Sequence, residues 1–245
     1  MPDEILAADL TDRLCQVRQQ LAHAAQHAGR EPQSIRLLAV SKTHPADQLR
    51  IAAQAGQLDF GESYLQEALA KIEALADLKL TWHFIGQLQS NKTRPVAEHF
   101  QWVHTVDRDK IATRLNEQRP HYAPPLNVCI QVKLAEEAGK GGVWPEQVLP
   151  LARHIQTLPR LQLRGLMCIP PPSDDYATQL AHFMRMRDLL AQLNTQVNKQ
   201  GFEMDTLSMG MSDDFAAAIA AGATMLRIGT AIFGERDYSA ESPQP

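Results

Sequence analysis

Lys42 stands at the end of a short apolar run, residues 35–42 (IRLLAVSK), which has the composition of a buried parallel strand. Because side chains alternate along a strand, Lys42 is expected on the same face as Leu38 and Val40. In apolar surroundings, desolvation lowers the pKa of a lysine and exposes the free amine that captures an aldehyde. The alternative is an ordinary lysine that reaches solvent from the end of a strand.

Two stretches near the end of the chain have the composition of a phosphate site. Residues 208–214 (SMGMSDD) offer hydroxyl groups and backbone amides, and we expect Ser212 to be the N-cap of the following helix. Residues 227–234 (RIGTAIFG) add Gly229 and Thr230. Exposed amides, hydroxyl groups and a helix dipole can hold a phosphate dianion without a cluster of lysines. Ordinary helix capping and tight turns explain the same residues equally well.

These residues need a scaffold, and the hydrophobic pattern of the chain predicts one. An amphipathic helix from Ile5 to His27 is followed by apolar runs that alternate with helical segments. The eight strand candidates are residues 35–42, 58–63, 80–86, 102–107, 126–134, 161–169, 206–210 and 225–229.

This order predicts an α/β fold, a single (β/α)8 TIM-type barrel with an extra N-terminal helix. An open doubly wound sheet is the alternative. We assign residues 1–236 to one domain and expect a frayed tail over residues 237–245. In such barrels the loops after the last two strands often bind phosphate, which favours the two stretches described above.

Arg227 is expected to point into the barrel, on the same face of its strand as Met225 and Gly229. A buried guanidinium needs an acceptor. Either it meets a ligand at the open end of the barrel, or it pairs with a carboxylate such as Glu62. In a closed barrel its strand would lie beside that of Lys42, and a neighbouring cation lowers the pKa of a lysine further.

Other polar residues carry weaker signals. His23 and His27 lie four residues apart on a helix, but no third ligand accompanies them, so we predict no metal site. His83 and His104 fall within or at the ends of predicted strands and are candidates for the core or the open end of the barrel. Residues 138–142 (AGKGG) contain no complete phosphate-loop or dinucleotide motif, and we interpret them as a loop.

Composition narrows the class of protein. The chain has 245 residues, a hydrophobic fraction of 44% and a formal net charge of −4, which provides no basic surface for a nucleic acid. Its start lacks the order of a secretion signal, and no run is long enough to cross a membrane. Three dispersed cysteines favour neither disulfides nor zinc. We therefore expect a cytoplasmic protein without nucleic-acid or membrane partners.

Six sequence blocks occur in order: LLAVSKTHP, FGESYLQEA, WHFIGQLQSNK, LRGLMCIPP, SMGMSDDF and LRIGTAIFGER. Together they resemble the pyridoxal phosphate homeostasis proteins, which look like the barrel domain of alanine racemase standing alone. The resemblance runs from about the first strand to Arg236. It implies an aldimine between pyridoxal 5′-phosphate and Lys42, with Arg227 facing the pyridine nitrogen. The phosphate contacts that it implies are Ser208, Met211, Ser212, Gly229 and Thr230. Ser63 and His83 are implied as further cofactor-side residues.

Some positions depart from that family's pattern. After the fifth strand, where the family commonly has an asparagine and a serine–lysine pair, this chain has Lys133 and Gly139. The cofactor motifs are otherwise intact, so this difference bears on the role of the loop in ligand exchange. Cys168 also stands where a smaller residue is frequent.

The resemblance implies a carrier of pyridoxal phosphate that takes part in intracellular homeostasis of the cofactor, as a monomer and without robust turnover. An arginine at the pyridine nitrogen disfavours ring protonation, on which catalysis depends. Few residues follow the last strand, so we expect no second domain to supply the opposing base of a racemase. Apoenzymes that use pyridoxal phosphate are candidate recipients. The alternatives are a weak amino-acid racemase, or an interaction protein that has lost the ligand.

Overall fold

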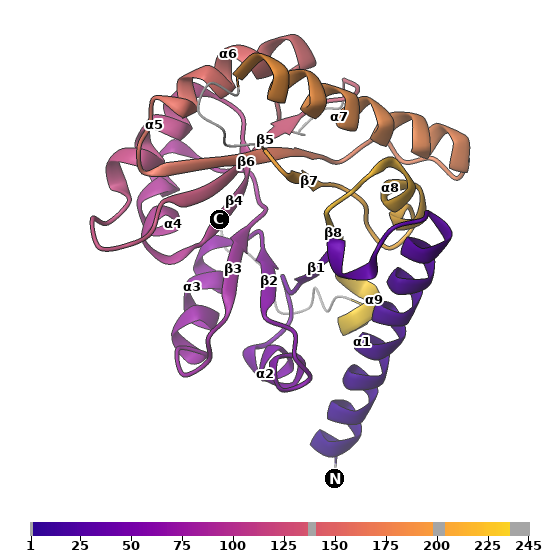
Figure 1. Ribbon diagram of the computed structural model, residues 1–245. Coiled ribbons are helices and arrows are strands. Elements are labelled where there is room, and N and C mark those ends of the chain that lie inside the picture. The colour runs from indigo at the N-terminus through magenta and orange to yellow at the C-terminus, as the bar shows by residue number, and fades with distance from the viewer. Residues whose placement is uncertain (1, 137–140, 198–203, 236–245) are drawn as a thin grey trace.

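The computed structural model describes residues 2–136, 141–197 and 204–235 of the chain. In this part of the chain, eight parallel strands pair in sequence order and β8 pairs with β1, which closes a barrel (Figure 1). The predicted (β/α)8 barrel is therefore confirmed, and the open sheet is excluded. The domain boundary at residue 236 and the tail over residues 237–245 lie outside the described residues, so both stay predictions.

Each strand lies within the apolar run that predicted it. The strands are β1 (Arg36–Val40), β2 (Asp59–Glu62), β3 (Thr81–Phe84), β4 (Trp102–Val106), β5 (Leu126–Val132), β6 (Leu161–Cys168), β7 (Thr206–Ser208) and β8 (Met225–Ile228). The predicted runs continue beyond the carboxyl ends of the strands, because their last residues, such as Lys42 and Gly229, already belong to loops. Those loops contain most of the predicted site residues.

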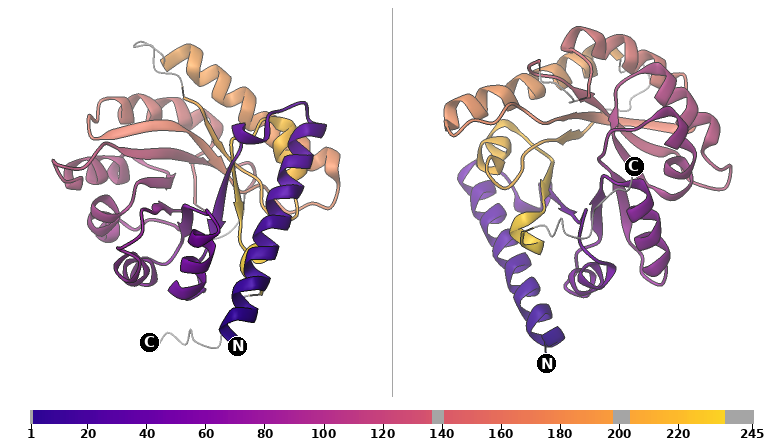
Figure 2. Two further views of the ribbon diagram at one scale, coloured as in Figure 1. Left: turned by 60° about the horizontal axis from the view of Figure 1, so that its bottom comes forward. Right: turned by 180° about the vertical axis from the view of Figure 1, so that it is seen from behind.

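Helices cover the outside of the barrel (Figure 1). They are α1 (Pro2–His27), α2 (Ala46–Gln54), α3 (Leu65–Ala74), α4 (Thr93–His99), α5 (Asp109–Gln118), α6 (Pro145–Gln156), α7 (Tyr176–Val197), α8 (Phe215–Ala221) and α9 (Thr230–Phe233), with short 3-10 turns at Pro32–Ser34 and Ser90–Lys92. The predicted N-terminal helix is confirmed as α1, which packs against α2, α8 and α9 (Figure 2). Sequence periodicity did not predict α9, because its four residues are too few to show a helical period. Among the helices described here, none is both long and apolar enough to cross a membrane.

Two apolar clusters fill the protein, one between the strands and the helices and a smaller one inside the barrel. The inner cluster consists of Leu38, Trp102, Cys129, Met167 and Met225. His83 of β3 and His104 of β4 are fully buried beside Trp102 in the same interior. Branched aliphatic side chains usually fill the interior of such barrels. This interior therefore departs from the usual pattern by burying a pair of histidines.

Burial lowers the pKa of both histidines, because the protein interior solvates an imidazolium poorly. At His83 the hydrogen bond with Asp59 opposes this effect. At His104 the neighbouring His83, Arg227 and Arg36 act in the same direction as burial, and the pKa lies well below its ordinary value. Both rings are therefore neutral near pH 7.

The neutral histidine pair makes stability depend on pH. The folded pKa values lie below the ordinary value of 6.5, so the unfolded chain binds more protons as the pH falls below that value. We expect the free energy of unfolding, measured by urea denaturation, to decrease by at most about 1.4 kcal/mol per pH unit for each histidine. His104→Gln is expected to show a weaker pH dependence, and His27→Gln, on the exposed side of α1, to behave as the parent protein. Equal pH dependence in all three proteins would contradict the assignment.

Candidate functional site

The backbone on both sides of Lys42 is held by side chains of α3, at the carboxyl end of the barrel. The carbonyl of Ser41 accepts a hydrogen bond of 2.7 Å from Lys71 Nζ. The amide of Thr43 donates one of 2.7 Å to Glu67 Oε1. Thr43 has a φ of 69°, in the left-handed region that residues other than glycine rarely adopt. Lys42 itself is partly buried, at the end of β1 as predicted.

A buried ion cluster supports this segment. Lys71 Nζ lies 2.8 Å from Glu62 Oε1 and also pairs with Glu67 of its own helix. Ser41 Oγ donates to the same oxygen of Glu62 at 2.6 Å. Burial raises the pKa of Glu62, and the Lys71 cation opposes this effect. The pairing of Glu62 with Arg227 that the sequence suggested is wrong, because Glu62 points outward from the barrel and contacts α3.

Arg227 points from β8 into the interior and is buried. Its Nη1 donates to Ser208 Oγ at 3.0 Å, and its Nη2 donates to the carbonyl of Cys168 at 2.9 Å. Burial lowers the pKa of this guanidinium. Within the described residues no carboxylate forms an ion pair with it. A guanidinium that is satisfied by neutral acceptors keeps its charge available for an anionic or electron-rich group.

Two glycines let the loops after β7 and β8 approach their neighbours closely. Gly210 has a φ of 96°, and a Cβ there would lie 2.6 Å from a side chain of α8. A Cβ on Gly229 would lie 3.0 Å from the carbonyl oxygen of Val40. The amide of Arg227 donates to the Gly210 carbonyl at 3.0 Å. The loop after β7 therefore contacts β8, and the loop after β8 contacts the end of β1, so the predicted phosphate contacts lie at the same end of the barrel as Lys42.

The remaining predicted phosphate contacts lie in these loops. Ser208 is buried at the end of β7, whereas Met211 is exposed and Ser212 is partly buried. The Met211 amide donates to Asp214 Oδ1 at 2.6 Å, so a phosphate group bound to this amide would displace that carboxylate. The prediction of Ser212 as an N-cap is wrong, because the residues before Asp214 form a turn and Asp214 itself precedes α8. Thr230 is exposed as the first residue of α9, where helix amides lack intrahelical partners.

Ser63 and His83 lie at different depths. Ser63 follows β2 at the carboxyl end of the barrel. Its backbone packs closely on Gly86, because a Cβ atom added to Gly86 would lie 2.2 Å from the Ser63 carbonyl oxygen. His83 lies deeper, with Nε2 at 3.0 Å from Asp59 Oδ1 and Nδ1 at 3.0 Å from His104 Nε2. Both ring nitrogens of His83 thus face protein groups. Contacts of Ser63 and His83 with a cofactor stay predictions.

The sequence did not predict the supporting roles of several residues near the site. Lys71 follows Glu67 by one helical turn, which is the spacing of an ordinary surface ion pair, so nothing in the sequence marks this pair as partly buried. Asp59 and His104 could have been found, because strand alternation places them inward with Gly61 and Trp102.

The remaining candidates from the sequence make other contacts. Lys133 follows β5, and its Nζ lies 5.7 Å from the centre of the Trp144 ring. Gly139 lies outside the described residues. His23 and His27 are exposed, with their Nε2 atoms 3.2 Å apart. In the described parts of the chain, no group of three side chains could hold a metal ion.

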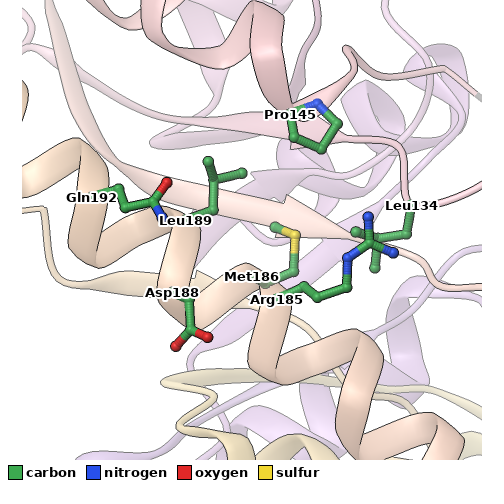
Figure 3. A pocket seen from close by; sticks show the side chains of 7 residues that line it. All are labelled: Leu134, Pro145, Arg185, Met186, Asp188, Leu189 and Gln192. Carbon is green, nitrogen blue, oxygen red and sulfur yellow. The ribbon is translucent and has the colours of Figure 1, made fainter.

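A separate pocket of about 240 Å³ lies between α7 and the segment that follows β5 (Figure 3). Leu134 and Pro145 line one side, and Met186 and Leu189 of α7 line the other. None of the predicted cofactor residues contributes to this pocket, so it does not belong to the candidate site.

Comparisons with known proteins point to one family. The family described as "Alanine racemase, N-terminal domain" matches residues 13–237. A pyridoxal phosphate homeostasis protein from Pseudomonas aeruginosa is 58% identical over 231 residues, which cover 94% of this chain and 97% of that protein. The protein of the same name from Escherichia coli strain K12 is 53% identical over 234 residues, which cover 94% of this chain and 98% of that protein.

Solved structures agree with these sequence matches. The structure of PipY from Synechococcus elongatus PCC7942 with PLP bound has a TM-score of 0.81 and 40% identity, and the match covers 92% of this chain and 100% of that chain. An alanine racemase from Corynebacterium glutamicum has a TM-score of 0.64 at 19% identity, over 91% of this chain and 64% of that chain. The second likeness shows a shared fold alone.

The Lys71 cluster offers a direct test of what holds the Lys42 segment. Lys71→Met leaves Glu62 buried without its cation, so we expect the free energy of unfolding in urea to fall by about 3–5 kcal/mol. The double variant Glu62→Leu/Lys71→Met removes both charges and is expected to recover most of this loss. A single variant as stable as the parent protein would show that the pair does not hold the segment.

Proposed function

Because the chain belongs to the pyridoxal phosphate homeostasis protein family, within the wider alanine racemase N-terminal domain family, we propose that it binds pyridoxal 5′-phosphate and carries it covalently on Lys42. In this role it takes part in intracellular homeostasis of the cofactor. One observation supports this proposal above the others. Arg227 is a buried cation with neutral acceptors, and two loops suited to a phosphate follow its own strand and the neighbouring strand β7.

The residues present fit this cofactor. Gly210 and Gly229 keep the backbone of both loops free of side chains that would collide with neighbouring atoms. Phosphate would be held at the positions of Ser208, Met211, Ser212, Gly229 and Thr230, by loop amides and by the hydroxyl groups of Ser212 and Thr230. Arg227 would face the pyridine nitrogen, and Ser63 and His83 would lie on the cofactor side. This assignment extends the family pattern to the positions that match it in this chain.

The chain's own residues favour storage over catalysis. When bound, pyridoxal phosphate supplies an aldehyde that condenses reversibly with a lysine amine. The hydrogen bonds that join α3 with the backbone of Ser41 and Thr43 would keep the Lys42 segment in place for this capture. A cation at the pyridine nitrogen disfavours ring protonation and so weakens the electron withdrawal that catalysis uses. The names of the relatives describe homeostasis rather than a reaction. We therefore propose a carrier without robust turnover.

We further propose that the protein acts in the cytoplasm as a monomer and passes the cofactor to apoenzymes that use pyridoxal phosphate. We propose no nucleic-acid partner, because a formal net charge of −4 does not favour binding to a phosphate backbone. A membrane partner is likewise not proposed. Size-exclusion chromatography with light scattering tests the monomeric state: we expect the molar mass of a single chain at every protein concentration.

Lys42→Ala is expected to abolish the visible absorbance band that the parent protein gains on addition of pyridoxal phosphate, because the covalent link is lost. Borohydride reduction of the parent protein followed by peptide mass spectrometry is expected to place the adduct on Lys42. Lys133→Ala is the matched control, since Lys133 also follows a barrel strand, and we expect it to keep both the band and the adduct.

Adducts spread over surface lysines, or an undiminished band in Lys42→Ala, would contradict the proposal. Turnover separates the carrier from the weak racemase. Sustained loss of the α-hydrogen from an L-amino acid, abolished in Lys42→Ala, would replace the carrier by an enzyme.

A further inference from the structure

A continuous chain of hydrogen bonds runs through the barrel interior from Asp59 to Arg227. His83 Nε2 lies 3.0 Å from Asp59 Oδ1, and His83 Nδ1 lies 3.0 Å from His104 Nε2. His104 Nδ1 lies 2.8 Å from Ser208 Oγ, which accepts a hydrogen bond of 3.0 Å from Arg227 Nη1. We call Asp59, His83, His104 and Ser208 the interior relay.

The interior relay spans the barrel from one end to the other. Asp59 is the first residue of β2 and so lies at the amino end, where its side chain is partly exposed. Ser208 is the last residue of β7, at the carboxyl end beside the candidate site. The two histidines between them are fully buried. The relay thus connects a carboxylate near solvent with the guanidinium of Arg227.

Donor and acceptor chemistry allows one direction for this chain when both histidines are neutral. The Asp59 carboxylate can only accept, so His83 carries its proton on Nε2 and its Nδ1 is an acceptor. His104 must then donate from Nε2, which leaves its Nδ1 as an acceptor for the hydroxyl hydrogen of Ser208. Ser208 Oγ in turn accepts from Arg227. Every donor therefore points from Arg227 toward Asp59.

The surroundings of the histidines favour this neutral arrangement. His83 stacks on Trp102, with ring centres 5.4 Å apart. The guanidinium groups of Arg36 and Arg164 lie 5.8 Å and 5.1 Å from the centre of the Trp102 ring. Arg227 adds a third cation at the other end of the chain. A proton added to either ring would meet burial and positive charge together.

We propose that the interior relay is a positioning device for Arg227. It presents Ser208 Oγ to the guanidinium as an oriented acceptor, and it keeps the relay's only carboxylate at the far end of the barrel. A carboxylate in direct contact would neutralise Arg227, whereas the relay fixes the guanidinium and leaves its charge uncancelled. This inference rests on the proposed function only for the identity of the group that Arg227 faces.

The interior relay determines which ring nitrogen of each histidine carries the proton, and this can be tested in the protein without any ligand. We expect nitrogen-15 NMR of the histidine side chains to show His83 and His104 as neutral rings protonated on Nε2. In Asp59→Leu the terminal acceptor is absent, so we expect His104 to shift toward protonation on Nδ1. Asp59→Asn keeps an acceptor oxygen and is expected to resemble the parent protein. Protonation of His104 on Nδ1 in the parent protein, or identical spectra in all three proteins, would overturn the relay.

Cofactor binding tests whether the relay acts on Arg227. We expect Asp59→Leu to weaken the affinity for pyridoxal phosphate by about threefold to tenfold, because the hydrogen-bond network that positions Arg227 loses one of its members. The visible absorbance maximum is expected to shift for the same reason. Asp59→Asn and the control Thr105→Val, which loses a buried hydrogen bond outside the relay, are expected to bind as the parent protein does. Unchanged affinity and absorbance in Asp59→Leu would overturn the positioning role while leaving the proposed function intact. A parent protein without an adduct on Lys42 would instead refute the proposed function, and the ligand-free NMR would still decide the relay.

Discussion

A guanidinium buried near the carboxyl end of β8 needs hydrogen-bond acceptors, and the rest of the site is arranged around the acceptors that it has. Arg227 takes the hydroxyl oxygen of Ser208 and the backbone carbonyl of Cys168. Since both acceptors are neutral, its charge is not cancelled, and the loops after β7 and β8, which contain amides and hydroxyl groups, lie at the same end of the barrel. Barrel closure adds the last part, because the pairing of β8 with β1 brings Lys42 to the same end.

Two polar arrangements support the site from opposite sides of the β1 and β2 strands. Outside the barrel, the ion cluster around Lys71 and Glu62 holds the backbone beside Lys42. Inside the barrel, the histidine pair leads to Ser208 and Arg227. Burying such groups costs stability unless their hydrogen bonds are made, and the apolar layer between strands and helices offsets this cost. The left-handed backbone at Thr43 is a further local cost next to Lys42.

The strand positions were predictable, because buried parallel strands leave continuous apolar runs that helical segments separate. The count of eight strands favoured a barrel, but its closure was settled by the pairing of β8 with β1, since the sequence also allowed an open sheet. The same pattern predicted the end of the barrel at which Lys42 and the two glycine-containing loops meet. Pairing between side chains was not predictable. Glu62 could be matched to any buried cation until the structure showed that it points toward α3 and contacts Lys71. The N-cap at Ser212 failed for a local reason, since a turn precedes α8.

The roles of individual residues came from family resemblance rather than from pattern. Strand alternation alone left Lys42 as either a ligand-bearing amine or a solvated lysine, and it left the two loops as either phosphate sites or ordinary turns. Physical reasoning about one sequence gives the face on which a side chain lies, but not the ligand that it meets. The hydrogen bonds of Arg227 narrow that choice, because a buried cation with neutral acceptors favours an electron-rich partner.

A crystal structure of the protein grown with pyridoxal phosphate would show directly whether Lys42 carries the cofactor. We expect continuous density from Lys42 Nζ to the cofactor, with the phosphate group between the loops after β7 and β8. Arg227 is expected at the pyridine nitrogen, with its hydrogen bond to Ser208 retained. Cofactor bound at another lysine, or an Arg227 that turns away to pair with a carboxylate, would contradict this expectation.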